Sequence, residues 1–179
     1  MAIARKTMLL ALVGAGDTPV EGITRLQKYC FLAEREEGIE VSDEDFDFTK
    51  YHFGPYSPKL YDDLEALENY GLIETVSTSR RADAVEALEG KQLTADFLLD
   101  RGDQSEADAA YQEKAYRLTK TGQEFIEKLE GQGNSREEIA RLRKIKSRFS
   151  TYSLRDLIRY VYTKYPQMTT ESEIRGFVF

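Results

Sequence analysis

KYHFGPYSPKLYDDLEALENYGLIETV, at residues 50–76, and AYRLTKTGQEFIEKL, at residues 115–129, decide the fold of this chain. The first stretch predicts a strand, a turn at Gly54-Pro55, a helix over 58–70 and a second strand. The second stretch predicts a strand that returns from a wing, followed by a new helix. Together they indicate a winged helix-turn-helix, an α+β fold that is mostly helical and contains a small antiparallel sheet.

Turn-forming residues mark the boundaries of these elements. Each proline fixes its own φ and disfavours helix in the residue before it, so the chain is expected to turn sharply at Gly54-Pro55. Ser57 is expected to be the N-cap of the helix over 58–70, and Gly71 the left-handed residue after its end. The residues of this structural motif are Gly54, Pro55, Tyr56, Ser57, Gly71 and Gly122.

Apolar spacing predicts the other elements. Apolar residues three and four positions apart indicate helices over about 2–13, over about 20–37 and through the basic segment, and a last helix is expected to begin at Ser153. Phe46 and Phe48 alternate with polar neighbours and predict a strand. The apolar stripes consist of Ile23, Leu26, Cys30 and Ala33, then Phe125, Ile126 and Leu129, then Ile139, Leu142, Ile145 and Phe149.

The 179 residues, 41% of them hydrophobic, are expected to form one domain in two parts. Residues 1–130 form a winged-helix body with a wing insertion at 77–113, and residues 131–179 form a basic C-terminal helical segment packed on that body. Residues 136–179 hold ten basic and five acidic residues, a net charge of +5 within a total of -7, which leaves -12 for residues 1–135. The chain as a whole therefore repels polyanions, and only its C-terminal segment carries the opposite charge.

The helix over 58–70 has the position that enters the major groove in a DNA-binding winged helix, but its outer face is acidic. Phosphates would repel these carboxylates. The wing adds apolar residues within an acidic flap at 80–112, and a long insertion of this kind is typical of a binding element. The expected contacts with a basic protein partner are Asp62, Asp63, Glu65, Glu68, Leu93 and Phe97.

Basic residues support an alternative hypothesis, a winged-helix transcriptional regulator that binds DNA. Contacts from Lys and Arg to phosphates supply much of the affinity of proteins for DNA. The expected contacts are Lys59, Arg80, Arg81, Arg141, Arg143, Lys144 and Arg148. The sequence leaves a second interpretation of the basic helix open, in which its side chains form ordinary ion pairs with the acidic body.

Catalysis is not expected, and the sequence predicts neither a cofactor nor a metal site. His52 is the only histidine and Cys30 the only cysteine, so zinc sites and histidine-based catalytic triads lack their usual residues. No glycine-rich phosphate loop or dinucleotide-binding pattern is present. One remote alternative is a metal-dependent nuclease, because Asp100 and Asp108 followed by Gln112-Glu113-Lys114 provide two carboxylates and a lysine.

A single cysteine excludes an internal disulfide and fits a reducing cytoplasm. Arg5-Lys6 followed by MLLALVGAG has the outline of a signal peptide. The apolar run is short, however, and it fits a first amphipathic helix better, so we expect a cytoplasmic protein without a signal peptide. No stretch has the length of a membrane span, and no membrane partner is expected.

Two of these motifs resemble a known family. ITRLQKYCFLAE at 23–34 and YHFGPYSPKLY at 51–61 are similar to the leucine-glutamine-lysine helix and the aromatic-Gly-Pro turn of the Panacea domain, also called the SocA-like antitoxin family. The similarity covers about 20–76 and extends more loosely to LRDLIRYVYTKYP at 154–166. The resemblance implies a helical, non-enzymatic protein that neutralises a cognate toxin by direct contact.

The main hypothesis is therefore a non-catalytic winged-helix interaction protein of antitoxin type. Its partner is expected to be a protein, such as a toxin, and DNA binding is the alternative. The sequence leaves open whether the chain also forms a homodimer.

Overall fold

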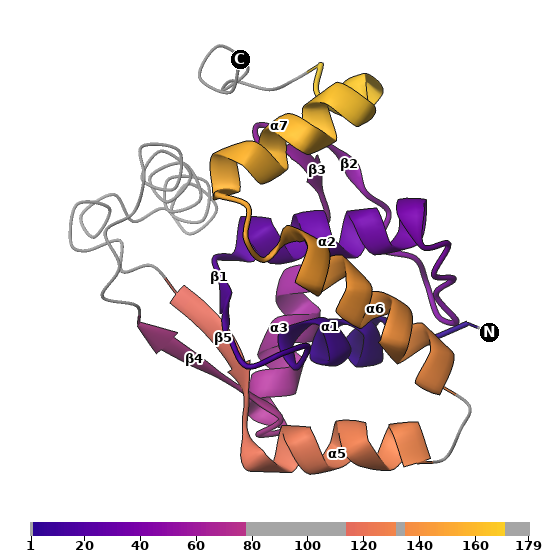
Figure 1. Cartoon of the computed structure of the whole chain (residues 1–179), viewed down its shortest axis with the longest axis vertical. Coiled ribbons are helices and arrows are strands. Elements are labelled where there is room, and N and C mark those ends of the chain that lie inside the picture. The colour runs from indigo at the N-terminus through magenta and orange to yellow at the C-terminus, as the bar shows by residue number, and fades with distance from the viewer. Residues whose placement is uncertain (1, 78–113, 132–134, 171–179) are drawn as a thin grey trace.

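The structure, a computed structural model, describes residues 2–77, 114–131 and 135–170. It is an α+β arrangement in which helices predominate (Figure 1). The helices are α1 (Arg5–Val13), α2 (Ile23–Glu36), α3 (Lys59–Asn69), α5 (Lys120–Gly131), α6 (Arg136–Phe149), α7 (Leu154–Lys164) and the 3-10 helix η1 (Pro166–Met168). The strands are β1 (Val20–Glu21), β2 (Thr49–Tyr51), β3 (Gly54–Tyr56), β4 (Ile73–Ser77) and β5 (Lys114–Leu118). None of the described helices combines the length and the apolar character that crossing a membrane requires.

The described strands form two separate antiparallel sheets. One has the strand order β1-β5-β4, and the other is the β2-β3 hairpin. β4 and β5 pair along their whole length, from Ile73 opposite Leu118 to Ser77 opposite Lys114. The two strands predicted on either side of the wing are therefore confirmed, while residues 78–113 between them lie outside the described residues.

One hydrophobic core joins the N-terminal and the C-terminal helices. α1 lies within it, because every residue from Met8 to Val13 is buried. α2 and α6 both pack against α1, and α7 lies along α2 on the side of the β2-β3 hairpin (Figure 1). The apolar stripe predicted for α6 is confirmed by four buried side chains, Ile139, Leu142, Ile145 and Phe149. The basic segment thus contributes to the same core as the body.

Several helix ends have the predicted chemistry. Gly71 follows α3 with a φ of 65° and donates its N–H to the Glu68 carbonyl at 2.8 Å, as a left-handed C-cap does. Ser153 Oγ accepts a hydrogen bond from the Asp156 N–H at 3.1 Å and so caps the start of α7. These caps fix where α3 ends and where α7 begins.

The Leu-Thr-x-x-Gly stretch builds the junction between β5 and α5. Thr119 Oγ1 accepts a hydrogen bond from the Gly122 N–H at 3.0 Å and donates one to the Gly71 carbonyl at 2.6 Å. A Cβ atom on Gly122 would lie 2.0 Å from the Leu72 carbonyl oxygen. This close backbone contact requires glycine, so Gly122 couples the start of α5 to the turn after α3.

Three local predictions are wrong. Phe46 and Phe48 lie in a segment without regular secondary structure, in which Asp47 between them has a φ of 51°, and the hairpin begins only at Thr49. Both rings pack on the core, which explains the alternation without a neighbouring strand. Phe125, predicted to be buried, is 42% exposed. The predicted helix over 20–37 begins only after β1, whose two residues are too few to show a period in the sequence.

Candidate interaction surface

Buried hydrogen bonds join the two motifs that resemble the Panacea domain. Gln27 Oε1 accepts from the Ser57 N–H at 2.7 Å, and Gln27 Nε2 donates to the Ser57 carbonyl at 3.1 Å. Lys28 Nζ donates to the Pro55 carbonyl at 2.9 Å. Gln27, Lys28 and Ser57 are all buried. The leucine-glutamine-lysine helix and the Gly-Pro turn therefore hold the β2-β3 hairpin on α2.

Ser57 is not the N-cap of α3, contrary to the prediction. Its hydroxyl donates to the Phe46 carbonyl, and α3 begins after Pro58 without a side-chain cap. The Gly-Pro turn itself is tight, with a φ of 85° at Gly54, and a Cβ atom there would lie 2.8 Å from the ring of Tyr162 in α7. The turn thus packs against both α2 and α7, and Ser57 belongs to that packing rather than to the start of α3.

Three partly exposed tyrosine rings lie together where the hairpin meets α3. The rings of Tyr51 and Tyr56 stack with their centroids 4.6 Å apart, and the ring of Tyr61 in α3 lies 6.0 Å from that of Tyr56. Tyrosine provides a large contact area at a low cost in side-chain entropy, and it is enriched at protein interfaces. We call these three residues the tyrosine cluster.

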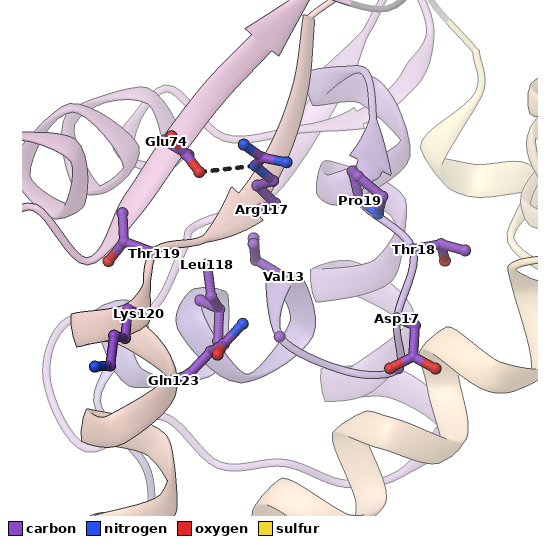
Figure 2. A pocket seen from close by; sticks show the side chains of 12 residues that line it. Val13, Asp17, Thr18, Pro19, Glu74, Arg117, Leu118, Thr119, Lys120 and Gln123 are labelled. Carbon is purple, nitrogen blue, oxygen red and sulfur yellow. Dashed lines mark hydrogen bonds and ion pairs between the residues drawn. The ribbon is translucent and has the colours of Figure 1, made fainter.

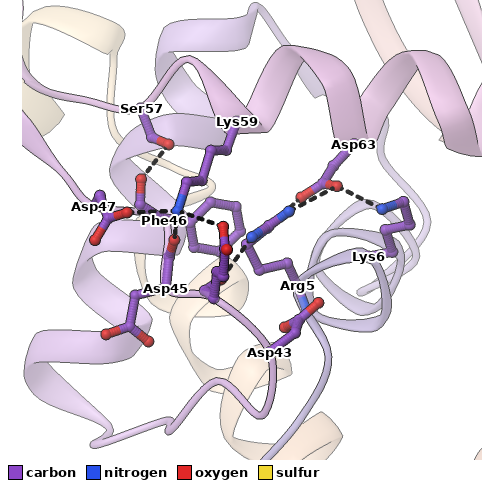
Figure 3. A network of polar contacts seen from close by, with 10 residues as sticks. Arg5, Lys6, Asp43, Asp45, Phe46, Asp47, Ser57, Lys59 and Asp63 are labelled. Atoms are coloured by element: carbon purple, nitrogen blue, oxygen red, sulfur yellow. Dashed lines mark hydrogen bonds and ion pairs between the residues drawn. The ribbon is translucent and has the colours of Figure 1, made fainter.

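Asp63 lies on the inner face of α3 and binds the start of α1 (Figure 3). Arg5 Nε donates to Asp63 Oδ2 at 2.7 Å, and Lys6 Nζ lies 2.8 Å from Oδ1. The Asp63 side chain is only 2% exposed. Burial opposes its ionisation, but the hydrogen bonds from Arg5 and Lys6 outweigh burial and lower the pKa of Asp63. The prediction that Asp63 faces a partner is wrong, because this residue fastens α3 to α1.

Lys59, predicted to reach phosphates, is held by the acidic loop that precedes β2 (Figure 3). Its Nζ donates to the Asp45 carbonyl at 2.8 Å, pairs with Asp47 and lies 3.3 Å from Glu44. The hydrogen bond to Asp47 raises the pKa of Lys59. The positive charge at the start of α3 is therefore balanced within the chain.

The outer face of α3 carries carboxylates that the chain itself does not neutralise. Asp62, Glu65 and Glu68 are exposed on that face. Glu68 accepts a hydrogen bond from the Thr75 hydroxyl. Asp62 and Glu65 have no hydrogen-bond or ion-pair partner among the described residues. Three of the four predicted carboxylates thus share one exposed surface, which we call the acidic face.

Arg148 is bound by α2. Its NH1 donates to Glu36 Oε2 at 2.8 Å, while Glu36 Oε1 accepts from the Tyr160 hydroxyl at 2.7 Å and lies 2.8 Å from Lys164 Nζ. Burial disfavours the charged form of Glu36, but the hydrogen bonds from Lys164 and Tyr160 prevail and lower its pKa. Glu36 therefore ties α6 and α7 to α2, and Arg148 is part of this tie.

The other predicted bases of α6 divide into engaged and free side chains. Arg141 NH1 donates to the Glu37 carbonyl at 3.0 Å, and Arg143 pairs with Glu130. Lys144 is exposed and, within the described ranges, has no hydrogen-bond or ion-pair partner. The basic helix thus forms the internal ion pairs that the sequence left open, and Lys144 remains as a free charge.

No protein-family model, curated protein or solved structure matches this chain. The resemblance to the Panacea domain therefore stays an expectation from the two motifs. The other predicted contacts with a partner or with DNA, Arg80, Arg81, Leu93 and Phe97, lie outside the described residues, as do Asp100, Asp108 and Gln112-Glu113 of the nuclease pattern.

A cleft of about 480 Å³ opens beside the three-stranded sheet, between the end of α1, β5 and the start of α5 (Figure 2). On its wall, Arg117 Nε of β5 donates to Glu74 Oε1 of β4 at 2.7 Å. Lys120 and Asp17 lie at its edge and are exposed. The charges of this cleft are therefore either paired or in contact with water, and none of them requires a ligand.

Cys30 and His52 lie in ordinary structural surroundings. Cys30 is buried in α2, and burial raises the pKa of its thiol well above the usual value, which keeps the sulfur protonated. The ring of His52 lies 4.3 Å from that of Tyr51 in the hairpin. In the part of the chain that the structure describes, no group of three His, Cys, Asp or Glu side chains is placed to hold a metal.

Sequence reasoning missed two buried cations between the body and the C-terminal helices. Arg25 of α2 and Lys146 of α6 are 6% and 3% exposed. A signal was present for Lys146, which lies four residues after Leu142 and three before Phe149 and so falls on the apolar side of its helix. Its charge alone suggested a solvent-facing position.

Proposed function

We propose that this chain is a non-catalytic winged-helix protein that binds a basic protein partner, as an antitoxin masks its toxin. The acidic face of α3 forms the binding surface, with the tyrosine cluster beside it. One observation carries this proposal: α3 exposes carboxylates that lack an internal cation, whereas most predicted DNA-binding bases that the structure describes are already engaged within the chain.

The order of the elements supports a winged helix. α1, β1, α2, α3, β4 and β5 follow the helix, strand, helix, helix, strand, strand order of that fold. The strand order β1-β5-β4 puts the strand that returns from the wing in the middle of the sheet, as in a winged helix. The β2-β3 hairpin would then be an elaboration of the turn between the second and the third helix, and α3 would be the helix that meets the partner.

Charge favours a protein over DNA as that partner. A DNA duplex carries one negative charge per about 1.7 Å of its axis, so Asp62 and Glu65 would face phosphates if α3 entered a groove. A basic protein surface would instead be attracted to these carboxylates, which speeds and orients association. The acidic face therefore fits a partner that presents Lys or Arg side chains.

The tyrosine cluster adds an anchor next to these charges. Tyrosine is among the residues that contribute most to the binding energy of protein interfaces. Tyr51, Tyr56 and Tyr61 are already packed on one another, so less side-chain entropy is lost when a partner covers them. Charge would steer the partner, and the tyrosines would hold it.

Charge reversal on α3 tests the proposal. The full-length chain and its Asp62→Lys, Glu65→Lys double variant would be used to capture a partner from the native host, and the partner would then be purified for titration calorimetry. We expect the double variant to bind at least about tenfold more weakly, because two close charge pairs become repulsive. Binding by the unmodified chain should also weaken as salt rises.

The matched control reverses two exposed acids elsewhere, with Glu124→Lys and Glu127→Lys in α5. This control has the same net charge as the α3 variant and should keep its affinity within about twofold if the site is local. If both double variants bound the partner equally weakly, net charge alone would explain the loss of affinity, and the proposed site on α3 would be contradicted. Circular dichroism of each variant checks that the fold is retained.

DNA binding would give a different pattern. In a gel shift at about 0.15 M salt, retardation of duplex DNA that is lost on Lys144→Glu would favour the alternative, since Lys144 is the predicted DNA contact of α6 that has no partner among the described residues. Arg141 and Arg148 are unsuitable for this test because they also hold the helices together. We expect no retardation by the unmodified chain, and retardation without any captured protein would overturn the proposal.

A further inference from the structure

A cavity of about 430 Å³ lies where the C-terminal helices meet the body. It is enclosed by β1, the first turns of α2, the end of α6 and the connection into α7, segments that Figure 1 shows side by side. Its volume falls within the range of small-molecule sites. Its rim includes the exposed residues Thr18, Ser150 and Thr151, so the cavity opens to solvent.

Two buried cations form part of its wall. Lys146 Nζ donates to the Thr18 carbonyl at 2.6 Å and to the Val13 carbonyl at 2.9 Å. Arg25 NH1 donates to the Tyr152 carbonyl at 2.8 Å. Neither cation has a carboxylate within ion-pair distance among the described residues. Buried charges are normally paired with an opposite charge, so carbonyl dipoles alone leave this site short of negative charge.

The pKa of Lys146 reflects the same deficit. Burial alone lowers the pKa of its ammonium group to about 8, which means that the surroundings disfavour the charge. The bond to Val13, the last residue of α1, gives Lys146 a structural role at the negative end of that helix. That role uses two of its three N–H groups, and the side chain also borders the cavity.

The charges around the cavity determine which ligand fits. Glu21 also lines the wall, and Asp156 at the rim is engaged by Arg159 at 3.0 Å and by the Ser153 hydroxyl. Asp156 is balanced by Arg159, and neither buried cation forms an ion pair among the described residues, so the wall favours an anionic ligand.

We infer that this cavity binds a small-molecule carboxylate, whose oxygens accept hydrogen bonds from Lys146 and Arg25. The planar guanidinium group matches a carboxylate, and the ammonium group supplies a second charge-assisted hydrogen bond. Tyr29, also buried on the wall, brings its phenol to the same place. The inference is independent of the acidic face, which lies on α3.

Nuclear magnetic resonance titration of the full chain, labelled with nitrogen-15, tests this inference. Acetate and succinate would be added up to tens of millimolar at constant ionic strength, with sodium chloride as the reference and inorganic phosphate as a competing probe. We expect saturable shifts of amides in residues 18–29 and 146–156 with a carboxylate. Shifts no larger than those from chloride, or saturation by phosphate alone, would overturn the assignment.

Variants locate the site. Lys146→Met should weaken carboxylate binding about tenfold, the value of one charge-assisted hydrogen bond, whereas Lys144→Met on the exposed side of the same helix should leave it within about twofold. Thr151→Phe, at the exposed rim, should block entry while the contacts of Lys146 remain intact. If Lys146→Met does not fold, Thr151→Phe decides, and carboxylate binding unchanged in that variant contradicts the inference.

Discussion

Gln27 and Ser57 exchange two hydrogen bonds, at 2.7 Å and 3.1 Å, although 30 positions separate them in the sequence. The side-chain amide of Gln27 has the donor and the acceptor that a neighbouring strand would offer to the backbone of Ser57. Ser57 is fully buried, so its N–H and C=O would otherwise lack partners. The side chain of Gln27 on α2 thus forms the two hydrogen bonds that a neighbouring strand would supply, and it holds the hairpin beside α3.

Gln27→Leu removes these two bonds while nearly conserving volume. Because the N–H and the C=O of Ser57 then stay buried without partners, we expect the free energy of unfolding to fall by about 2–4 kcal/mol. Urea unfolding followed by circular dichroism measures the change. Gln123→Leu, the same substitution at an exposed position of α5, should change stability by less than about 0.5 kcal/mol. Equal effects of the two variants would show that the amide pairing contributes nothing.

Gly122 and Gly131 allow a matched comparison within α5. A Cβ atom on Gly122 would lie 2.0 Å from the Leu72 carbonyl oxygen, whereas one on Gly131 would meet nothing within 4 Å. Gly122→Ala should therefore destabilise the protein by about 1–3 kcal/mol through overpacking against backbone. Gly131→Ala should be neutral or stabilise it by up to about 1 kcal/mol, because alanine favours helix. Thermal unfolding of both variants measures these changes in stability. A Gly122→Ala protein as stable as the unmodified protein would contradict the close contact.

Periodicity allowed much of the fold to be predicted from the sequence. The stripe of α6, the stop at Gly71 and the paired strands β4 and β5 follow from local patterns, and the structure confirms them. The sequence also contained a signal for the buried position of Asp63, but the prediction did not follow it. Asp63 lies three residues after Leu60 and four before Leu67, so spacing puts it on the buried face, but its charge suggested the surface.

Contacts between distant segments could not be predicted in this way. The partners of Glu36 lie more than 100 positions away, at Arg148, Tyr160 and Lys164. Each of these residues is also a plausible surface residue in its own helix. Only the packing of α6 and α7 on α2 shows that Arg148, a predicted phosphate contact, binds this carboxylate. Among the described residues, Lys144 is then the predicted DNA contact that has no partner within the chain.

The pairing of Asp63 with Arg5 and Lys6 predicts a loss of stability in acid. The folded-state pKa of Asp63 is lowered, so its contribution is complete above the unfolded value of about 3.9 and disappears as pH falls through the folded value. Asp63→Asn should cost about 1.5–3 kcal/mol at pH 7, and its difference from the unmodified protein should shrink towards about pH 2. Urea unfolding at several pH values measures this trend.

The neighbouring Asp62 provides the control for that experiment. Asp62→Asn changes the same functional group at an exposed position without an internal partner among the described residues. It should alter stability by less than about 0.5 kcal/mol at pH 7. A pH-independent difference between Asp63→Asn and the unmodified protein would mean that packing, rather than the ion pair, accounts for the role of Asp63.

Glu34 of α2 has the opposite dependence on pH. Oε1 of Glu34 is buried without a hydrogen-bond partner among the described residues. Burial and the nearby Asp45 raise its pKa to about 7, so the stability it contributes is fully present below the unfolded value of about 4.3 and is lost as pH rises through about 7.

Glu34→Gln should therefore be more stable than the unmodified protein at pH 8 and nearly equal to it at pH 5, because the amide avoids a buried negative charge. Urea unfolding at both pH values tests this expectation. Glu40→Gln, which removes a charge from an exposed residue of the same hollow, should show no such dependence. If the gain from Glu34→Gln is the same at pH 5 and pH 8, removal of a negative charge from an acidic surface explains it, and ionisation of a buried carboxylate does not.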